Sequence, residues 1–238
     1  MKLDDQLAMP LYKQLVMDLS KRIQSGDLVE GSRLPPEQEI SEIYGVSRIT
    51  VRTALKELAK ENLIISKQGK GTFVGKKKMA RDLSLATSFT QACLEMGRSP
   101  GAKVIRMGLE TPNDDDVRQL NIPYSSKVVV LERLRFADGE PISLEFDRFP
   151  ESYSFLLNEN MDDVSLLALL KEKYSIEFVN VHRTIELVYA SQEIGKLLNL
   201  RSGYPLLFVT GVGQQASSGV PGQRSLQYII GDRFKFYL

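Results

Sequence analysis

The stretch LPPEQEISEIYGVSRITVRTALKELAKENLIISKQGKGTFV, residues 34–74, decides the fold of the first part of the chain. Its two adjacent prolines are tolerated only at or before the first turn of a helix, so we predict that a helix begins at Glu37. That helix ends at Tyr44, because Gly45 breaks it. Ser47 can then cap a second helix. The apolar stripe of this second helix repeats at helical spacing and consists of Val51, Ala54, Leu55 and Leu58.

The end of the same stretch predicts a β-hairpin. Residues 63–65 and 72–74 are mostly apolar or β-branched, and the connection between them contains Gly69 and Gly71. Two short runs of this kind around a glycine-containing connection are typical of antiparallel strands. The order helix, turn, helix and hairpin therefore predicts a winged helix-turn-helix.

Polar and basic side chains lie where a DNA-reading surface needs them. Arg48, Thr50 and Arg52 begin the second helix outside its apolar stripe, where a recognition helix presents side chains to base edges and phosphates. Lys67 and Lys70 lie at the tip of the hairpin. Arginine and lysine are often merely solvated, and some helix-turn-helix proteins bind no DNA, but the combination of both features favours DNA binding.

The charge of the chain is divided unevenly. Residues 1–78 hold 14 Lys and Arg against 10 Asp and Glu, whereas residues 79–238 hold 17 against 20. A basic N-terminal part suits a module that binds phosphates. The single cysteine, Cys93, excludes an intrachain disulfide and a cysteine metal cluster, and it suits a reducing cytosol.

No apolar run approaches the ~20 residues that cross a bilayer, and the N-terminus lacks the pattern of an export signal. We therefore expect a cytoplasmic protein with no membrane partner. His182 is the only histidine, and no pair of nucleophile and base is recognisable. The sequence therefore predicts no metal site, no catalytic residues and no cofactor.

Two domains and a short basic linker are predicted. Residues 1–75 form the first domain, in which residues 11–25 make a helix that packs behind the helix-turn-helix. Residues 76–82 form the linker. Residues 83–238 alternate strand and helix patterns, which predicts an α+β domain on an antiparallel sheet.

Two arginines of the second domain are candidates for an anion site. Arg133 and Arg135 are two apart on a predicted strand, so both point to one face of the sheet, where like charges repel unless an anion lies between them. Arginine matches phosphate and carboxylate groups with two parallel hydrogen bonds. Glu145, beyond the hairpin turn at residues 138–139, could accept hydrogen bonds from sugar hydroxyls. The alternative is structural: the arginines are paired with acids such as Glu132 or Glu145.

Short motifs of the first domain match a known pattern. They are Gly45-Val46-Ser47-Arg48, Thr50-Val51-Arg52, Ala54-Leu55, Leu58 and the run from Gly69 to Val74. These motifs resemble the DNA-binding domain of the GntR family of bacterial transcription regulators. The candidate contacts to double-stranded operator DNA are then Arg33, Gln38, Ser47, Arg48, Thr50, Arg52, Lys67, Gly69 and Lys70. Where the family has Pro-Ser-Glu-Arg this chain has Pro-Pro-Glu-Gln at residues 35–38, which affects base preference.

The second domain contains a second set of motifs. They are Leu131 to Arg135, Asp138 to Ile142, Glu145, Ser165-Leu166, Tyr228 and Gly231 to Phe234. These residues resemble the effector domain of the HutC subfamily, called UTRA, which has a chorismate-lyase-like fold. The resemblance implies that a small effector is held by Ser88, Phe89, Thr90, Arg133, Arg135, Glu145, Ser165 and Tyr228. The chain most resembles the members that sense phosphorylated amino sugars, which often have tyrosine where this chain has Leu167.

Together these features predict a homodimeric transcription repressor that loses operator affinity when it binds a small anionic metabolite, with a sugar phosphate as the first candidate. Two-fold protein symmetry predicts a nearly palindromic operator. The resemblance alone places the dimer contact in the C-terminal domain. One alternative is a regulator that responds to a carboxylate catabolite. The other is a lyase-like enzyme with a DNA-binding appendage.

Overall fold

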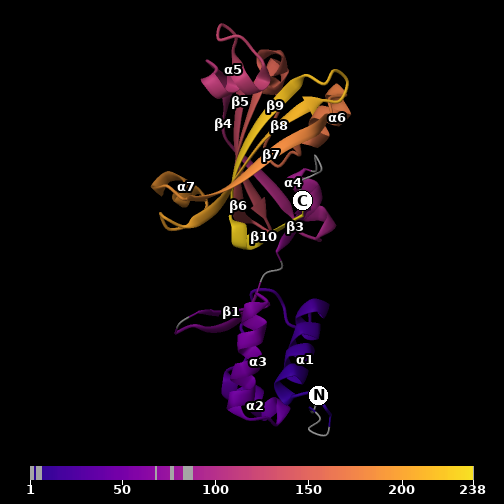
Figure 1. The fold of residues 1–238 in the computed structure, drawn as a ribbon, viewed down its shortest axis with the longest axis vertical. Helices are drawn as coiled ribbons and strands as arrows, with labels where there is room; N and C mark the ends of the chain where they lie inside the picture. Colours follow the sequence, from indigo (N-terminus) through magenta and orange to yellow (C-terminus); the bar gives the residue numbers. More distant parts are fainter. Residues whose placement is uncertain (1–2, 4–6, 68, 76–77, 83–87, 238) are drawn as a thin grey trace. The chain divides into compact units, whose positions relative to one another are not determined.

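The computed structural model of the chain describes residues 3, 7–67, 69–75, 78–82 and 88–237. The chain divides into two compact units, residues 1–77 and residues 78–238. Each unit is described by itself (Figure 1).

The first unit has the predicted order of elements. Its helices and strands are α1 (Leu11–Ser25), α2 (Glu37–Tyr44), α3 (Arg48–Lys60), β1 (Ile64–Lys67) and β2 (Gly71–Val74). The two strands pair antiparallel as a hairpin that projects from the helices (Figure 1). The prediction of a winged helix-turn-helix is confirmed.

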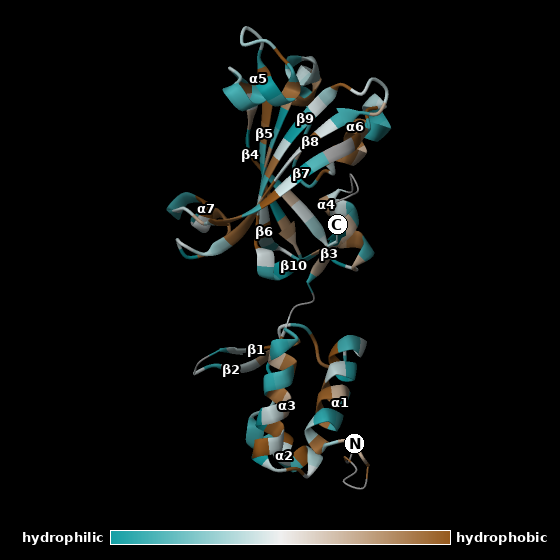
Figure 2. Cartoon of the chain, viewed as in Figure 1, coloured by the Kyte–Doolittle hydropathy of each residue, from teal (hydrophilic) through white to brown (hydrophobic). Residues whose placement is uncertain are grey.

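The core of the first unit is made by the predicted apolar stripes. Leu15 and Leu19 of α1 are buried together with Val51, Ala54 and Leu58 of α3. Each fully buried large side chain contributes about 1.5–3 kcal/mol relative to an exposed one, so this seam is the main source of stability for the unit. The corresponding brown segments of α1 and α3 are visible in Figure 2.

The second unit is built on one six-stranded antiparallel sheet with the strand order β4-β5-β6-β9-β8-β7. The strands of this sheet are β4 (Pro100–Glu110), β5 (Val128–Ala137), β6 (Glu140–Pro150), β7 (Phe178–Tyr189), β8 (Pro205–Gln215) and β9 (Pro221–Ile229). The other elements are β3 (Met79–Asp82), α4 (Phe89–Glu95), α5 (Asp114–Leu120), η1 (Glu151–Asn158), α6 (Leu166–Tyr174), α7 (Gln192–Leu197), η2 (Gly231–Arg233) and β10 (Phe234–Tyr237). The predicted α+β class is confirmed.

The predicted hairpin between β5 and β6 has a two-residue turn. Asp138 and Gly139 both have positive φ angles, 52° and 76°. Turns of this kind match the twist of the flanking strands, and aspartate followed by glycine is a preferred sequence for them. The turn and a register shift between Arg135 and Phe136 together place Arg133 directly opposite Glu145.

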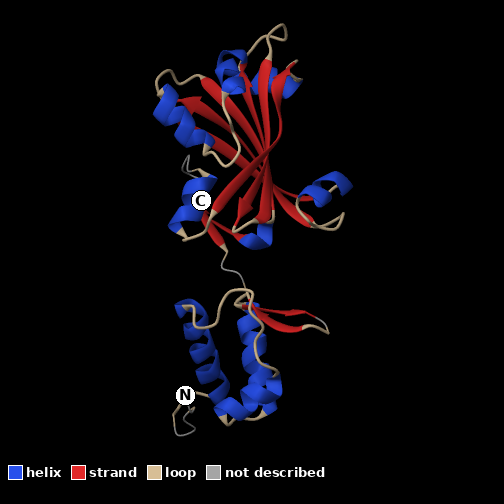
Figure 3. Ribbon diagram, turned by 180° about the vertical axis from the view of Figure 1, so that it is seen from behind, coloured by secondary structure: helices blue, strands red, loops and turns tan. Residues whose placement is uncertain are grey.

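Helices cover both faces of the sheet (Figure 3). On one face, η1 and α6 pack against Val129 and Leu131 of β5, and α4 packs with the β3 and β10 pair against Val209 of β8. On the other face, α5 packs against Val128 of β5, and the segment around α7 packs against Leu144 of β6. Neighbouring residues of one strand thus face different helices, as the alternation of side chains along a strand requires.

The expected linker at residues 76–82 is wrong over its last four residues. Residues 79–82 form β3, which pairs in parallel with β10 at the opposite end of the chain. Met79 is 1% exposed and lies opposite Phe234, so a partner distant in sequence turns this short segment into a strand. Residues 76 and 77 lie outside the described residues.

None of the helices among the described residues is long and apolar enough to cross a membrane. In the same part of the chain, no group of three or more His, Cys, Asp and Glu side chains is arranged to hold a metal ion.

Candidate functional site

The start of α3 is fixed by its own first turn. The Ser47 hydroxyl accepts a hydrogen bond from the Thr50 amide at 3.1 Å, and the two side-chain hydroxyls lie 2.9 Å apart. An N-cap of this type stabilises a helix by about 1 kcal/mol. Both residues therefore orient the N-terminal end of the helix that carries the candidate DNA contacts.

The two arginines of α3 are held differently. The Arg52 guanidinium donates to Glu37 of α2 at 3.1 Å, while 58% of its side chain remains exposed. This carboxylate raises the pKa of Arg52. Arg48 is exposed, and no ion pair or hydrogen bond holds its guanidinium within the described part of the chain. Arg48 is thus available to a DNA phosphate or base, whereas Arg52 has to give up the Glu37 carboxylate before it can bind a phosphate.

The hairpin places the remaining basic residues. Lys67 lies with its ammonium 5.0 Å from the centre of the Phe73 ring, and the Lys70 amide donates to the Lys67 carbonyl at 2.9 Å. Arg33 forms an isolated β-bridge with Phe73, so it belongs to the base of the wing. Gly69 has a φ of 71°, which allows the tight turn at the tip.

Two further side chains belong to this surface. Gln38 donates to Glu42 of its own helix at 3.2 Å. Ile49 is 77% exposed, although it lies between two candidate contacts in the first turn of α3. Ile49 was missed among the candidate contacts, although the spacing that places Val51 and Ala54 in the core also places Ile49 outside it.

A cavity of about 70 Å³ lies in the second unit, on the face of the sheet that also carries α4 and α6. One water needs about 10–15 Å³ of such space, so the cavity has room for a larger polar group. The predicted effector residues that line it are Ser88, Phe89, Thr90, Arg133, Arg135, Glu145 and Ser165. The structure brings these seven residues together, and their role in effector binding stays a prediction.

Arg133 is buried in an ion-pair network. It donates to Glu145 at 3.2 Å and to the Val164 carbonyl at 3.0 Å, and an Asp147 oxygen lies 3.8 Å from it. The side chain is 3% exposed. The structural alternative for this arginine is therefore correct in part, because Glu145 is its partner across the strand pair.

Arg135 lies farther from the cavity carboxylates than Arg133 does. Its guanidinium donates to the Thr90 hydroxyl at 2.9 Å and stacks 4.7 Å above the Phe89 ring, and its Nε lies 3.9 Å from Glu145. Burial lowers the pKa of Arg135, although Glu145 opposes that shift. The Nε atoms of Arg133 and Arg135 are buried and have no hydrogen-bond partner among the described residues. Buried unsatisfied donors of this kind are rare, and an anion would satisfy them.

Two serine caps border the cavity. Ser88 accepts from the Gln91 amide at 3.1 Å at the start of α4, and Ser165 accepts from the Ala168 amide at 3.4 Å at the start of α6. Leu167 also lines the cavity.

The prediction that Tyr228 contacts the effector needs correction. Tyr228 lies on the opposite face of the sheet, where its ring contacts Phe208 at 4.7 Å and Phe146 at 5.8 Å. Its neighbour Gln227 lines the cavity instead. The reason is the alternation of side chains along β9, which sends adjacent residues to opposite faces.

Several polar residues of the cavity were missed. They are Arg81, Asp147, Arg183, Thr210, Gln223, Ser225 and Gln227. Arg81 was assigned to the linker, and its place in the cavity depends on the pairing of β3 with β10. Asp147 was within reach of the sequence argument, because it lies two residues after Glu145 on one predicted strand and so shares its face.

The ionisation of Asp147 is expected to make the stability of the folded protein depend on pH. Burial, with the neighbouring Glu145 carboxylate, raises the pKa of Asp147 from 3.8 to about 6, against the pull of Arg133. The folded protein therefore holds this proton more tightly than the unfolded chain. The resulting stability is fully present below pH 3.8 and is lost as the pH rises through about 6.

We expect sulfate, which keeps its charge in this range, to bind more tightly at about pH 5.5 than at about pH 7.5, because protonation of Asp147 leaves Arg133 less neutralised. Titration calorimetry at both pH values measures this difference, and Asp147→Asn should abolish it. An unchanged pH dependence in Asp147→Asn would contradict the assignment.

The comparisons with known proteins agree with both units. Residues 95–235 match the model of the UTRA domain, and residues 11–74 match that of bacterial regulatory proteins of the gntR family. The chain is 29% identical to the HTH-type transcriptional repressor NagR of Bacillus subtilis, over 99% of this chain and 97% of that protein. It is 27% identical to the mannosyl-D-glycerate transport/metabolism system repressor MngR of Escherichia coli, over 83% and 82%. The crystal structure of PhnF from Mycobacterium smegmatis superimposes with a TM-score of 0.71 at 26% identity, covering 93% of this chain and 96% of that one.

Proposed function

From the premise that the chain belongs to the gntR family of bacterial regulatory proteins and carries a UTRA domain, we propose that it is a repressor released from operator DNA by an anionic sugar derivative. The chain is a transcription regulator with a DNA-binding unit and an effector-type unit. The observation that carries the proposal is the cavity with Arg133 and Arg135, in which two buried guanidinium Nε donors have no partner among the described residues.

The composition of the cavity supports a sugar phosphate as the effector. Four arginines line it, against the two carboxylates of Glu145 and Asp147, so the lining carries an excess of positive charge that suits an anion. Its carboxylates, glutamines and hydroxyls suit the hydroxyl groups of a sugar. The name of MngR refers to mannosyl-D-glycerate, a sugar derivative, which supports the same chemical class. A carboxylate catabolite is the alternative, because arginine binds both groups.

The proposed mechanism is a change in the arrangement of two DNA-binding units. An effector that binds better to the DNA-incompetent arrangement weakens operator binding, and by linkage the operator weakens effector binding by the same factor, typically about 5–150-fold. We place the protein in the cytoplasm, where it meets DNA and metabolites. In this proposal the cavity recognises its ligand and carries out no reaction.

The test is direct. Fluorescence anisotropy with operator DNA, selected first from a random duplex pool, is expected to show release by one member of a panel of phosphosugars and organic acids. In a thermal-shift screen, the same ligand at about a hundred times its dissociation constant should stabilise the protein by about 2.7 kcal/mol. Conversion of that ligand into a product would favour the enzyme alternative instead.

The proposed homodimer uses the edge strand β7. Ile185, Leu187 and Tyr189 of this strand are 40%, 63% and 68% exposed, and their spacing by two places them on one face. An exposed apolar edge strand in a soluble protein requires protection, which a second copy would provide. This surface belongs to the C-terminal unit, where the resemblance places the dimer contact.

We expect the double variant Leu187→Lys and Tyr189→Lys to be monomeric, because buried lysines without partners destabilise an interface. Size-exclusion chromatography with light scattering on the full chain measures the mass. Val220→Lys, at a loop residue that is 52% exposed, is the matched control and should stay dimeric. A dimeric double variant would place the interface elsewhere.

A further inference from the structure

The cavity has two separate cationic ends. The cavity floor is formed by residues that lie in register across the sheet. In one row Arg133 lies opposite Glu145, Glu145 opposite Gln227, and Gln227 opposite Val209. In the next row Asp147 lies opposite Ser225, Ser225 opposite Gly211, and Gly211 opposite Arg183. The first end therefore belongs to β5 and the far end to β7.

The distance between the two ends follows from the strand order. From β5 to β7 the sheet crosses β6, β9 and β8, which makes four inter-strand steps of about 4.8 Å each, or about 19 Å between the backbones. Arginine side chains from both strands shorten this gap. The two ends are thus formed by side chains from different strands of the sheet, Arg133 and Arg135 on β5 and Arg183 on β7.

Arg81 completes the far end. It comes from β3, is 7% exposed, and donates to the Gln227 side chain at 2.7 Å. Within the described residues no carboxylate lies in ion-pair distance of Arg81. Burial lowers the pKa of Arg81, and the more distant carboxylates of Glu145 and Asp147 oppose that shift.

Arg183 lines the same cavity as Arg81. After burial, the positive charge of Arg81 is the next cause that lowers the pKa of Arg183 to about 10. The carboxylate of Asp82 opposes this shift. The two guanidinium groups of the far end therefore repel each other, and both border the cavity that an anion could occupy.

The two ends differ in the groups that lie beside their arginines. Arg133 and Arg135 have Glu145 and Asp147 beside them, at 3.2 Å to 3.9 Å. The acid that acts on Arg183 is Asp82, and Arg81 has the neutral Gln227 as its acceptor. Arg81 is thus a buried cation whose hydrogen-bond acceptor among the described residues is neutral, and burying a charge of this kind is costly unless an anion lies beside it.

We infer that the effector carries two acidic groups, one held at Arg133 and Arg135 and a second held at Arg81 and Arg183, with a hydroxyl-bearing chain between them over Glu145 and Asp147. This inference rests on the proposed function of the cavity as the effector site. It narrows the effector class from sugar phosphates in general to those that carry a second acidic group. Arg81 and Arg183 then determine specificity for that second group.

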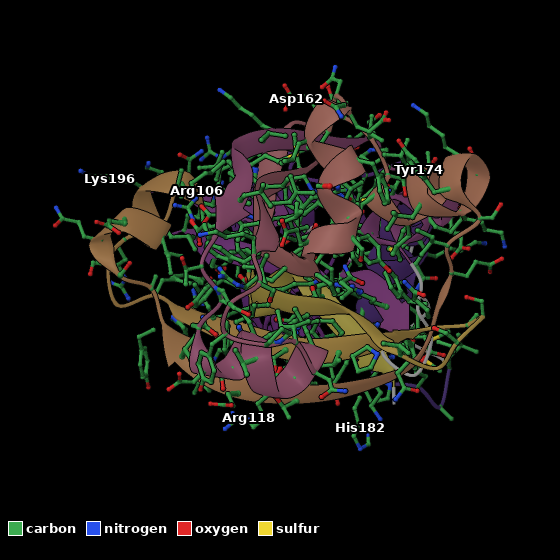
Figure 4. All side chains as sticks on the ribbon, turned by 90° about the horizontal axis from the view of Figure 1, so that it is seen from above. Arg106, Arg118, Asp162, Tyr174, His182 and Lys196 are labelled. Atoms are coloured by element: carbon green, nitrogen blue, oxygen red, sulfur yellow. The ribbon has the colours of Figure 1, made fainter. Side chains whose placement is uncertain are left out.

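The first test counts anion positions. Crystals of the full chain are soaked in selenate, whose selenium gives an anomalous signal. We expect two peaks in each chain, one beside Arg135 and one between Arg81 and Arg183. Arg183→Met should lose the second peak and keep the first. The control is Arg118→Met, which removes an arginine with 71% side-chain exposure on α5, at the periphery in Figure 4, and should show both peaks. A wild-type map without a peak at the far end would overturn the inference.

The second test uses two ligands that differ in one group. In 6-phosphogluconate a carboxylate replaces the terminal hydroxymethyl group of sorbitol 6-phosphate. Calorimetric titration of the wild type should show at least about tenfold tighter binding of 6-phosphogluconate, since a hydrogen-bonded ion pair contributes that much. Arg183→Met should bind both ligands equally, and Arg183→Lys, which keeps the charge, should restore part of the difference. Equal affinities in the wild type, or an undiminished preference in Arg183→Met, would count against a second acid site.

Failure of this inference and failure of the proposed function are distinguishable. A single selenate peak beside Arg135, together with effector-dependent release of operator DNA, would overturn only the inferred second anion position at Arg81 and Arg183. Two peaks in a protein that shows no operator binding would support the two-ended cavity and overturn the proposed repressor.

Discussion

Replacing both Arg133 and Arg135 by methionine is expected to leave operator binding intact and to abolish release by the effector. The two arginines supply the first cationic end of the cavity, and their unsatisfied Nε donors are the groups that an anion would satisfy. Hydrogen bonds to charged groups contribute about 1.5–3 kcal/mol each, so the concentration of effector needed for release should rise at least about 100-fold. Fluorescence anisotropy with labelled operator measures both quantities on one sample.

The ion pairs within the cavity require a second variant. Without Arg133, the Glu145 and Asp147 carboxylates stay buried without their cation, and breaking a buried pair in this way costs about 3–5 kcal/mol of stability. Adding Glu145→Gln and Asp147→Asn removes these charges and should restore the melting temperature while the effector response stays lost. If the stable quadruple variant is still released at wild-type effector concentrations, the effector binds elsewhere.

Arg48→Ala and Arg52→Ala are each expected to weaken specific operator binding by about 1–3 kcal/mol. Both side chains project from the first turns of α3, outside the stripe that packs against α1. We expect Arg48→Ala to have the larger effect, because Arg52 already has the Glu37 carboxylate as a partner and must give it up on binding DNA. Gel-shift titration at one fixed salt concentration measures the loss.

Two controls separate a direct contact from a general loss of charge. Lys60→Ala removes a cation from the last turn of the same helix, where it pairs with Glu57, and should leave the affinity within about twofold, since exposed pairs contribute little. Glu37→Gln removes the carboxylate that pairs with Arg52 and should slightly tighten the binding of operator DNA. Wild-type affinity in both arginine variants would show that α3 is not the recognition helix.

The local structure of the first unit was predictable because its signals are local. The prolines before Glu37, Gly45 and the Ser47 cap act within one helical turn, and the spacing of Val51 and Leu58 reports burial directly. The observed bounds of α2 agree with the predicted ones. The same holds for the turn at residues 138–139, where the backbone angles depend only on aspartate and glycine.

The sequence alone also determined that Arg133 and Arg135 share a face, because side chains alternate along any strand. It could not determine what lies on that face. The pairing of Arg133 with Glu145 depends on the register of one hairpin, and the place of Tyr228 depends on the phase of β9 relative to the sheet. A register shift of one residue turns every side chain of a strand to the opposite face of the sheet. A resemblance in sequence therefore does not determine which face a residue occupies.

Only the tertiary structure decided the far end of the cavity. Arg81 looked like part of a basic linker, because β3 has four residues and no apolar periodicity that marks a strand. It becomes a strand by pairing with β10, at the opposite end of the domain's sequence. Arg183 reaches the same cavity from β7 through a sheet order in which β9 lies between β6 and β8. Local patterns determined the elements, and the long-range pairing that brings four arginines around two carboxylates depended on the folding of the whole domain.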